Sequence, residues 1–252
     1  MKQIEAMDRV ITADGIHYKV LNDMVWQAVS DGAKRIILED VVGQRYIGCG
    51  LKGEDVEIII RGVPGNDLAA FMDGPRIIVE GNAQDGVGNT MNAGEVIVHG
   101  NAGDIIGYAM RGGRIFVKGN VGYRVGIHMK AYRDLFPVIV IGGVAGDFLG
   151  EYMAGGLLIV LGLGSEEKDI VGDFVGTGMH GGNIFIRGGV KNAILGKEVG
   201  ISLVSEDDMT LIRKHIEDFC NHFSFDIDEV LSVPFFKLYP HSHRPYGKLY
   251  AY

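Results

Sequence analysis

The segment GNAQDGVGNTMNAGEVIVHG (residues 81–100) runs directly into GNAGDIIGYAMRGGRIFVKG (residues 100–119), and the two segments follow one pattern. Methionines mark one position of this pattern: Met72, Met91, Met110 and Met129 are evenly spaced, and Met153 and Met179 follow after longer gaps. The longer gaps contain insertions of five residues near AYRDLF and seven near GSEEKDI. A fixed period of about 20 residues is typical of a solenoid.

Each period contains one short β-branched run, then glycine, then an apolar pair before the methionine. No period has the uninterrupted length that a helical repeat needs. Short strands separated by glycines, which allow tight left-handed corners, predict an all-β fold: a right-handed parallel β-helix of about seven rungs. The runs are residues 58–60, 77–79, 96–98, 115–117, 139–141, 158–160 and 184–186.

The repeat also sorts side chains between the inside and the outside of the coil. One inward-pointing residue of each strand run forms a column, and this column and the stacked methionines are expected to fill the core. Period-two alternation places a second, entirely apolar column outside, and isolated domains rarely leave such a stripe exposed. We therefore expect another element or another protein to cover it, and we treat it as a candidate partner interface. This outer stripe consists of Ile59, Ile78, Ile97, Phe116, Val140, Ile159 and Phe185.

The bulk composition limits the functional classes. The chain has 252 residues, 47% hydrophobic content, 39 glycines and a net charge of −8 without a basic cluster, which argues against nucleic-acid partners and anionic membrane surfaces. The N-terminal residues lack the apolar core of a signal peptide, and no apolar run is long enough to span a membrane. Cys49 and Cys220 are far apart and form no CxxC motif. These features predict a cytoplasmic protein without a disulfide framework.

The two ends depart from the repeat, although the whole is expected to be one structural domain. Residues 1–55 are predicted to be an N-terminal capping segment with a helix after an N-cap at Asn22 and a strand at 34–41. Residues 56–204 form the glycine-repeat β-helix. Within residues 205–252, Ser205 and Asp208 indicate a capping box, and the helix that follows is expected to cover the last rung. The aromatic and proline-rich tail beyond it is predicted to lie outside the core.

One glycine motif resembles a dinucleotide-binding fingerprint. Gly176, Gly178 and Gly181 fit GxGxxG, and Glu198 lies where a ribose-binding acid could follow. That site requires a strand before the glycines and a helix after them, whereas GNIFIRGG after Gly181 has the pattern of a strand. The glycines are therefore interpreted as rung corners.

An acidic column gives two interpretations. Stacked carboxylates on adjacent rungs could attract a cation, or each could accept hydrogen bonds from the backbone of its own turn, which is the favoured interpretation. The column contains Asp85, Asp104, Asp147 and Asp173. Histidines offer only a weak zinc hypothesis, because His128, His180 and the pair His241 and His243 lack a third ligand at fixed spacing.

Several motifs carry a family resemblance. VVGQRYIG, RGVPGNDLAAFMDG, GNAGDIIGYAMRGGRI and FFKLYP resemble the C-terminal glycine-repeat (GXGXG) domain of the glutamate synthase large subunit over nearly the whole chain. The resemblance implies a β-helix without catalytic residues that packs against a glutamine amidotransferase and an FMN and iron–sulfur synthase, here as separate subunits. FMN and the cluster would be bound by those partners, and no cofactor or metal by this chain. The sequence lacks their signatures, since Lys2 follows Met1 and no cysteines cluster.

Two other functions stay open. One of the subunits of formylmethanofuran dehydrogenase has a similar repeat, so the chain could be the scaffold of that type of complex. It could also be an independent β-helix that binds a ligand such as a carbohydrate in a lateral groove, which requires exposed carboxylates and aromatic rings on one face. Self-association as a homo-oligomer through the outer stripe is a further assembly that the sequence allows.

Overall fold

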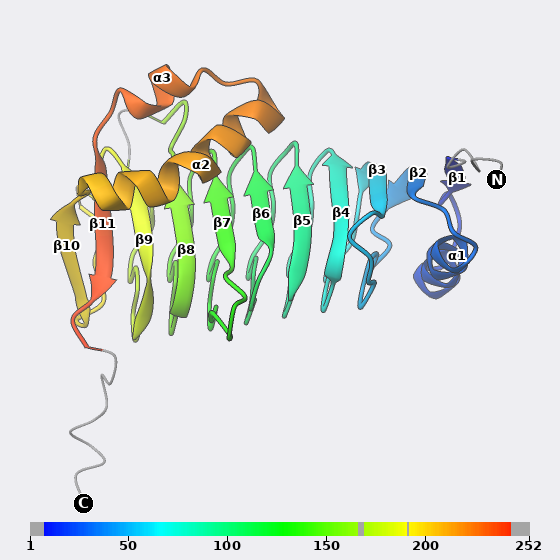
Figure 1. The fold of residues 1–252 in the computed structure, drawn as a ribbon, viewed down its shortest axis with the longest axis horizontal. Helices are drawn as coiled ribbons and strands as arrows, with labels where there is room; N and C mark the ends of the chain where they lie inside the picture. Colours follow the sequence, from blue (N-terminus) through cyan, green and yellow to red (C-terminus); the bar gives the residue numbers. More distant parts are fainter. Residues whose placement is uncertain (1–7, 166–168, 191, 243–252) are drawn as a thin grey trace, which may run out of the picture.

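The computed structural model describes residues 8–165, 169–190 and 192–242. They form one eleven-stranded sheet in the order β1-β2-β3-β4-β5-β6-β7-β8-β9-β11-β10, coiled into a solenoid (Figure 1). The predicted all-β parallel β-helix is confirmed. The strands are β1 (Arg9–Thr12), β2 (Arg35–Val42), β3 (Glu57–Val63), β4 (Asp73–Glu80), β5 (Ala93–Val98), β6 (Arg114–Val117), β7 (Val138–Ile141), β8 (Ala154–Val160), β9 (Gly181–Arg187), β10 (Val199–Leu203) and β11 (Phe235–Pro240).

The repeat fixes the register of the parallel strands. All seven predicted runs lie in β3 to β9, which six turns of the chain connect. Ile60 pairs with Val79, Val79 with Val98, and Val98 with Val117, so each step along the sequence places an equivalent residue on its neighbour. These side chains point inward and are fully buried. The six stacked methionines are also fully buried in the same cluster, which confirms their predicted place in the core.

Residues with a left-handed backbone conformation form the corners of the coil. In one corner Ile105, Gly107 and Ala109 have φ of 52°, 68° and 50°, and equivalent residues recur around the coil. Their N–H groups alternate in direction: Ile105 donates to Tyr123 on the next rung at 2.8 Å, and Gly107 donates to Val87 on the preceding rung at 2.8 Å. A side chain at Gly107 would collide with the inward-pointing Ile139. Glycine therefore satisfies both the backbone angle and the close packing at this point.

The N-terminal end continues the solenoid. β1 and β2 pair in parallel with each other, and β2 pairs in parallel with β3, so the sheet extends across the expected boundary at residue 56. Helix α1 (Tyr18–Ser30) lies beside this end (Figure 1). The predicted N-cap at Asn22 is wrong, because His17 caps the helix. Asn22 instead donates to the carbonyls of Tyr18 and Arg45, both at 2.8 Å, and so ties α1 to the first corner of the coil.

The C-terminal end differs more from expectation. Helix α2 (Glu206–Phe223) has the predicted capping box of Ser205 and Asp208, but it lies across the outer face of the sheet, running from β10 toward β6, and does not cover the last rung (Figure 1). The short helix α3 (Ile227–Leu231) follows.

Part of the tail that was predicted to lie outside the core belongs to it. Strand β11 inserts antiparallel between β9 and β10, with Phe235 2% and Leu238 0% exposed. The prediction is wrong for this segment because an antiparallel strand satisfies the open edge of β9, which no repeat follows. The remainder of that tail, residues 243–252, lies outside the described residues.

Candidate functional site

The outer stripe is largely covered by the chain itself. Most of its residues are buried in one cluster with the apolar face of α2, so this part of the predicted partner interface is not free for another protein. The helix reaches the stripe because its apolar residues recur at helical spacing and match the stacked column beneath. The stripe residues are Ile97, Phe116, Val140, Ile159 and Phe185, and the helix residues are Ile212, Ile216, Phe219, Cys220 and Phe223.

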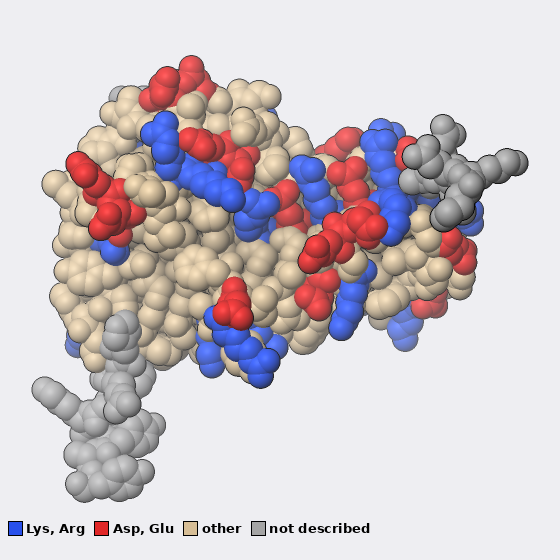
Figure 2. All heavy atoms as spheres, in the orientation of Figure 1, with Lys and Arg blue, Asp and Glu red and all other residues tan. Residues whose placement is uncertain are grey.

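The end of the outer stripe beyond α2 lies between charged side chains. Ile59 is 6% exposed and Ile78 is half-buried. On both sides, charges of opposite sign alternate from strand to strand and form ion pairs, among them Arg61 with Glu39 at 2.6 Å and with Glu80 at 3.1 Å. Red and blue side chains accordingly interleave over this part of the outer face in Figure 2. The ladders are Arg35, Glu57, Arg76, Glu95 and Arg114 on one side and Glu39, Arg61 and Glu80 on the other.

One ladder connects the sheet to α2. Arg114 lies 2.7 Å from Glu95 and 2.6 Å from Asp218 of the helix. His222 Nε2 lies 3.7 Å from Glu95 Oε1. Burial opposes ionisation of Glu95, but the close approach of the His222 ring and the charges of Arg114, His222 and Arg76 outweigh this effect and lower the pKa of Glu95. The ionised carboxylate thus helps to hold the C-terminal half of α2 on the sheet.

The acidic column consists of backbone acceptors. Asp85 Oδ1 accepts a hydrogen bond from the Asp104 N–H at 2.9 Å, and Asp104 Oδ1 accepts from Tyr123 at 2.8 Å. Asp147 Oδ1 accepts from Asp173 at 2.9 Å, and Asp173 Oδ1 from Ile194 at 3.0 Å. Each carboxylate therefore bonds to the next rung, not to its own turn as expected. Within the described ranges, no group of three or more His, Cys, Asp or Glu residues is suited to hold a metal ion.

A second ladder, of asparagines, runs parallel to the first. Asn82 Oδ1 accepts from the Asn101 N–H at 2.8 Å, Asn101 from Asn120 at 2.7 Å, and Asn120 from Val144 at 2.9 Å. Glycine precedes most ladder positions because the side-chain oxygen of the rung below occupies the place of a Cβ, as Asp104 does at Gly122. The repeated GNxxD pattern of residues 81–85 and 100–104 thus encodes two columns of hydrogen bonds between rungs. The aspartates were predicted to form a column, whereas the asparagine column was not predicted, although the even spacing of Asn82, Asn101 and Asn120 was the available signal.

The dinucleotide-like motif has a structural role. Gly176 and Gly178 are corner residues with φ of 67° and 70°, and Gly181 begins strand β9. The helix that a dinucleotide site needs is therefore replaced by a strand, which confirms the interpretation as rung corners. Glu198 accepts a hydrogen bond from the Gly178 N–H at 3.3 Å, and the ring of Tyr152 lies against Gly178.

The described histidines and cysteines form no group of three or more that could hold a metal ion. His128 stacks on Tyr152, with ring centroids 5.4 Å apart, and meets Tyr108 edge-on at 6.0 Å. Cys49 and Cys220 are free thiols, and burial raises the pKa of both. His243 lies outside the described residues, so the zinc hypothesis at His241 and His243 stays untested.

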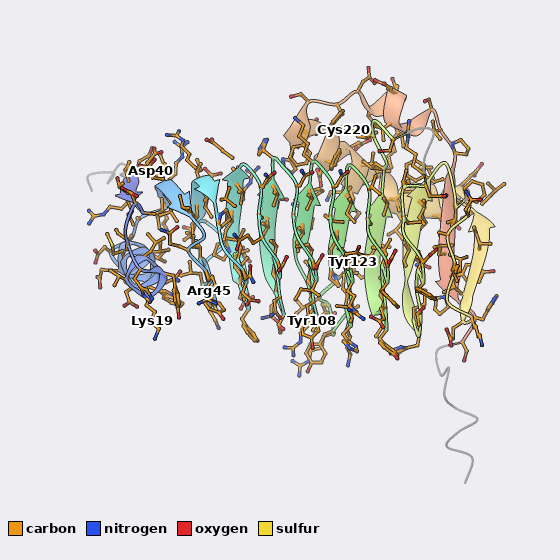
Figure 3. The ribbon with its side chains drawn as sticks, turned by 180° about the vertical axis from the view of Figure 1, so that it is seen from behind. Lys19, Asp40, Arg45, Tyr108, Tyr123 and Cys220 are labelled. Atoms are coloured by element: carbon orange, nitrogen blue, oxygen red, sulfur yellow. The ribbon has the colours of Figure 1, made fainter. Side chains whose placement is uncertain are left out.

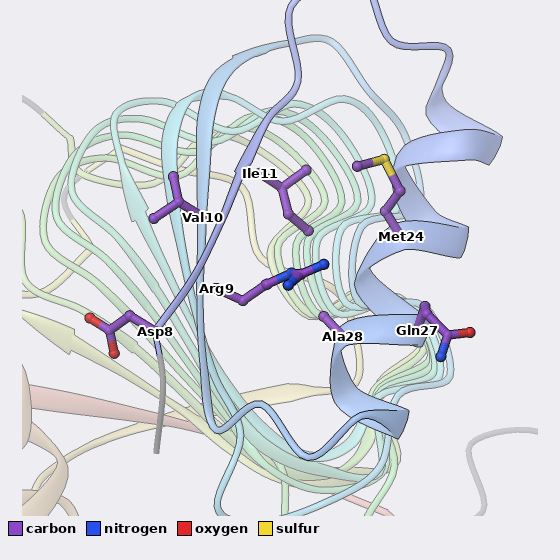
Figure 4. A pocket seen from close by; sticks show the side chains of 7 residues that line it. All are labelled: Asp8, Arg9, Val10, Ile11, Met24, Gln27 and Ala28. Carbon is purple, nitrogen blue, oxygen red and sulfur yellow. The ribbon is translucent and has the colours of Figure 1, made fainter. Parts of the chain in front are cut away.

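A cavity of about 460 Å³ lies at the N-terminal mouth of the solenoid, between β1 and α1 (Figure 4). Two of its polar side chains have partners: Asp8 pairs with Arg35 at 3.1 Å, and Gln27 donates to Asp31 at 2.7 Å. The cavity is thus the open end of the core, where the stack of rungs stops. Its lining residues are Asp8, Arg9, Val10, Ile11, Met24, Gln27 and Ala28.

The fold and its ladders define a glycine-repeat parallel β-solenoid. The family model described as "GXGXG motif" matches residues 28–240. The chain belongs to this family, the glutamate synthase-type domain. It is also 46% identical over 259 residues to Uncharacterized protein MJ1350 of Methanocaldococcus jannaschii, a match that covers 100% of this chain and 98% of that protein. No helix among the described residues has the length and apolar character needed to cross a membrane.

Proposed function

We propose that the chain is a non-catalytic structural subunit of a glutamate synthase-type oxidoreductase complex, and that it packs against separate glutamine amidotransferase and FMN/iron–sulfur subunits. The observation that carries this proposal is the GXGXG match over residues 28–240 of a chain that is itself one solenoid. FMN and the iron–sulfur cluster belong to the partner subunits, and this chain binds neither. The complex would act in the cytoplasm, in glutamate biosynthesis and nitrogen metabolism.

The polar side chains of the repeat bond to other parts of the coil, which supports a structural role. The Asn and Asp side chains of the repeats accept hydrogen bonds from neighbouring rungs, as Asn101 does from Asn120 and Asp104 from Tyr123. The charged ladders on the outer face are paired in the same way between strands. These contacts stiffen a column along its axis, which is what a spacer between two catalytic subunits requires.

The lateral-groove alternative receives less support from the aromatic side chains. Phe148 and Phe174 stack on each other with centroids 5.0 Å apart and planes 15° apart, and His128 stacks on Tyr152 with planes 10° apart. The ring faces that contact each other in these pairs are not available as a flat platform for a sugar. The formylmethanofuran dehydrogenase-type scaffold predicts different partner proteins and is distinguished by their identity.

Purification of the affinity-tagged protein from its native host at low salt tests the proposal. We expect two proteins to co-purify, a glutamine amidotransferase and a flavin and iron–sulfur protein, identified by mass spectrometry, and flavin absorbance to appear in the eluate. A host strain with an untagged copy is the control for non-specific binding. A protein that purifies alone and colourless would overturn the proposed function, and subunits of a formylmethanofuran dehydrogenase would replace it with that alternative.

A further inference from the structure

The first insertion into the repeat forms a projecting loop between β6 and β7. Residues 130–137 carry the five extra residues, and the loop closes on itself because Tyr132 and Leu135 exchange backbone hydrogen bonds of 3.1 and 3.0 Å. The Lys130 N–H still donates to Met110 at 2.9 Å, as the repeat requires. The loop projects at the lower edge of the solenoid, away from α2 (Figure 1). The strands on both sides stack in register across it, and of its side chains Ala131, Leu135 and Pro137 pack on the coil while the others are exposed.

Exposed aromatic residues gather on and beside this loop. Tyr132 and Phe136 are 45% and 46% exposed, and Tyr108 is 38% exposed. Figure 3 places Tyr108 at the same lower edge. Tyr108 is linked to the loop's base through its edge-on contact with His128, which lies just before Lys130 in the chain. Exposed Tyr, Phe and Arg side chains in one place are typical of the centre of a protein–protein interface.

Cations that pair with no described residue lie around these rings. Arg111 and Lys130 occupy the same repeat position on adjacent rungs, and both are exposed. Neither they nor Arg133 forms an ion pair with a residue that the structure describes, whereas the arginines of the outer-face ladders are all paired. The Arg133 guanidinium lies 5.1 Å from the ring centre of Tyr132. Figure 2 shows Lys and Arg gathered at this lower edge with an acidic side chain beside them, and Asp134 of the loop is exposed as well.

We propose that this insertion surface docks an acidic surface of one of the partner subunits. Arg111 and Lys130 repel each other as like charges on adjacent rungs, and carboxylates of a partner offset this repulsion. The attraction is local to these cations, since the chain as a whole carries a net charge of −8. The rings supply the apolar contact area that a phosphate group alone would not use, so a protein fits the surface better than a small anion. The inference rests on the proposed function and adds to it the site of contact. The insertion surface consists of Tyr108, Arg111, Lys130, Tyr132, Arg133 and Phe136.

Charge reversal in the tagged protein, purified from the native host, tests this proposal. We expect R111E/K130E to retain about tenfold less of one or both partner subunits than the wild type, because both cations face the acidic surface. The control K197E/K214E makes the same change in net charge at exposed lysines elsewhere and is expected to retain the partners. Circular dichroism of both variants checks that they fold. A photo-crosslinking residue in place of Tyr132 is expected to link to an acidic segment of a partner subunit.

The outcomes of these experiments separate the proposed docking surface from the proposed function. A complex that R111E/K130E retains in full overturns the docking surface and leaves the proposed function standing. A crosslink to a second copy of this chain also overturns it, since the surface would then join copies. Equal loss in K197E/K214E would show a general charge effect and likewise overturn the docking surface. A wild-type protein that purifies alone overturns both proposals.

Discussion

At the scale of single residues, the ladder side chains act as acceptors for a neighbouring rung. Asp104 Oδ1 accepts from the Tyr123 N–H at 2.8 Å, and Asn101 Oδ1 accepts from the Asn120 N–H at 2.7 Å in nearly the same geometry. The charge of the aspartate is therefore not what the ladder needs. A neutral amide oxygen in the same place can accept the same hydrogen bond.

We expect Asp104→Ala to lower the free energy of unfolding by about 1 to 2 kcal/mol, because it removes a hydrogen bond to a charged acceptor and leaves the Tyr123 N–H unpaired. Asp104→Asn keeps the acceptor oxygen and is expected to cost less than half of that. Urea denaturation of the two variants and the wild type measures the difference. Equal destabilisation by Asn and Ala would mean that the negative charge, not the hydrogen bond, stabilises the rung.

At the scale of elements, helix α2 covers part of the sheet, although it does not belong to the repeat. Phe219 is fully buried, and its ring lies 4.8 Å from Phe223 and 5.7 Å from Phe225. The sheet beneath has its own backbone ladder and its own inner core. Loss of α2 contacts therefore affects the helix before it affects the strands.

We expect Phe219→Ala to cost about 3 to 5 kcal/mol at the contact between helix and sheet. Hydrogen exchange should then become faster for the backbone amides of α2 and stay slow for those of β3 to β9. Leu211→Ala, on the exposed side of the same helix, is the control and should change neither. Equal loss of protection in the strands would show that helix and solenoid unfold as one unit.

The attachment of α2 should weaken in mild acid. Burial lowers the pKa of His215 below its usual 6.5, and the charges of Arg114 and Lys214 add to this effect against the opposing charge of Asp218. A depressed histidine pKa means that the unfolded chain takes up the proton first. The stabilising contribution is thus complete above about pH 6.5 and is lost as the pH falls toward the folded pKa.

The expected slope from His215 is at most about 1.4 kcal/mol of unfolding free energy per pH unit. Thermal unfolding measured between pH 7.5 and 5.0 should show this loss, and His215→Gln should reduce it. His99 adds to the same effect, since burial also lowers its pKa. Glu95 acts in a lower range, because its pKa is below the usual 4.5 and its contribution disappears only as the pH falls further. A slope unchanged in His215→Gln would contradict the assignment.

The sequence predicted the elements whose positions are set by contacts between neighbouring rungs. The regular period determined the seven strands, their register and the inner core, because equivalent residues one period apart stack on each other. The position of α2 depends on contacts such as Arg114 with Asp218, which lie far apart in the chain. Helical periodicity predicted the helix and its apolar face but contains no information on which surface that face meets. For the same reason the outer stripe was recognised as a surface to be covered, while the covering element was not identified.

At the scale of the whole molecule, the solenoid is a stack whose stability depends on nearest neighbours. A chain without residues 63–81 loses one full period, including β4, and joins Gly62 to Asn82 at equivalent positions. β3 then meets β5 in register, with Ile60 opposite Val98. We expect this variant to fold with a β-rich circular dichroism spectrum, although Glu57 then meets Glu95 and reduces its stability.

Removal of only residues 63–72 is the matched control. This deletion joins β3 directly to β4 and removes the corner between them, so β4 cannot turn back to stack on β3, and we expect that variant to lose its cooperative thermal transition. If the two deletions have equal effects, removal of a whole period is no better tolerated than removal of part of one, and the prediction is wrong. The comparison uses spectra and melting curves of purified proteins and needs no partner.

The insertion between β6 and β7 has a consequence for how such a chain can change over time. Arg114 pairs with Val138 and Ile115 with Ile139, in the same register that joins β5 to β6, although the chain takes a longer path between β6 and β7. The stack therefore tolerates a longer corner without any adjustment of its strands. Natural selection can lengthen, shorten or recharge this corner while the core stays the same, so homologous solenoids can acquire different partners at one fixed point of a conserved column.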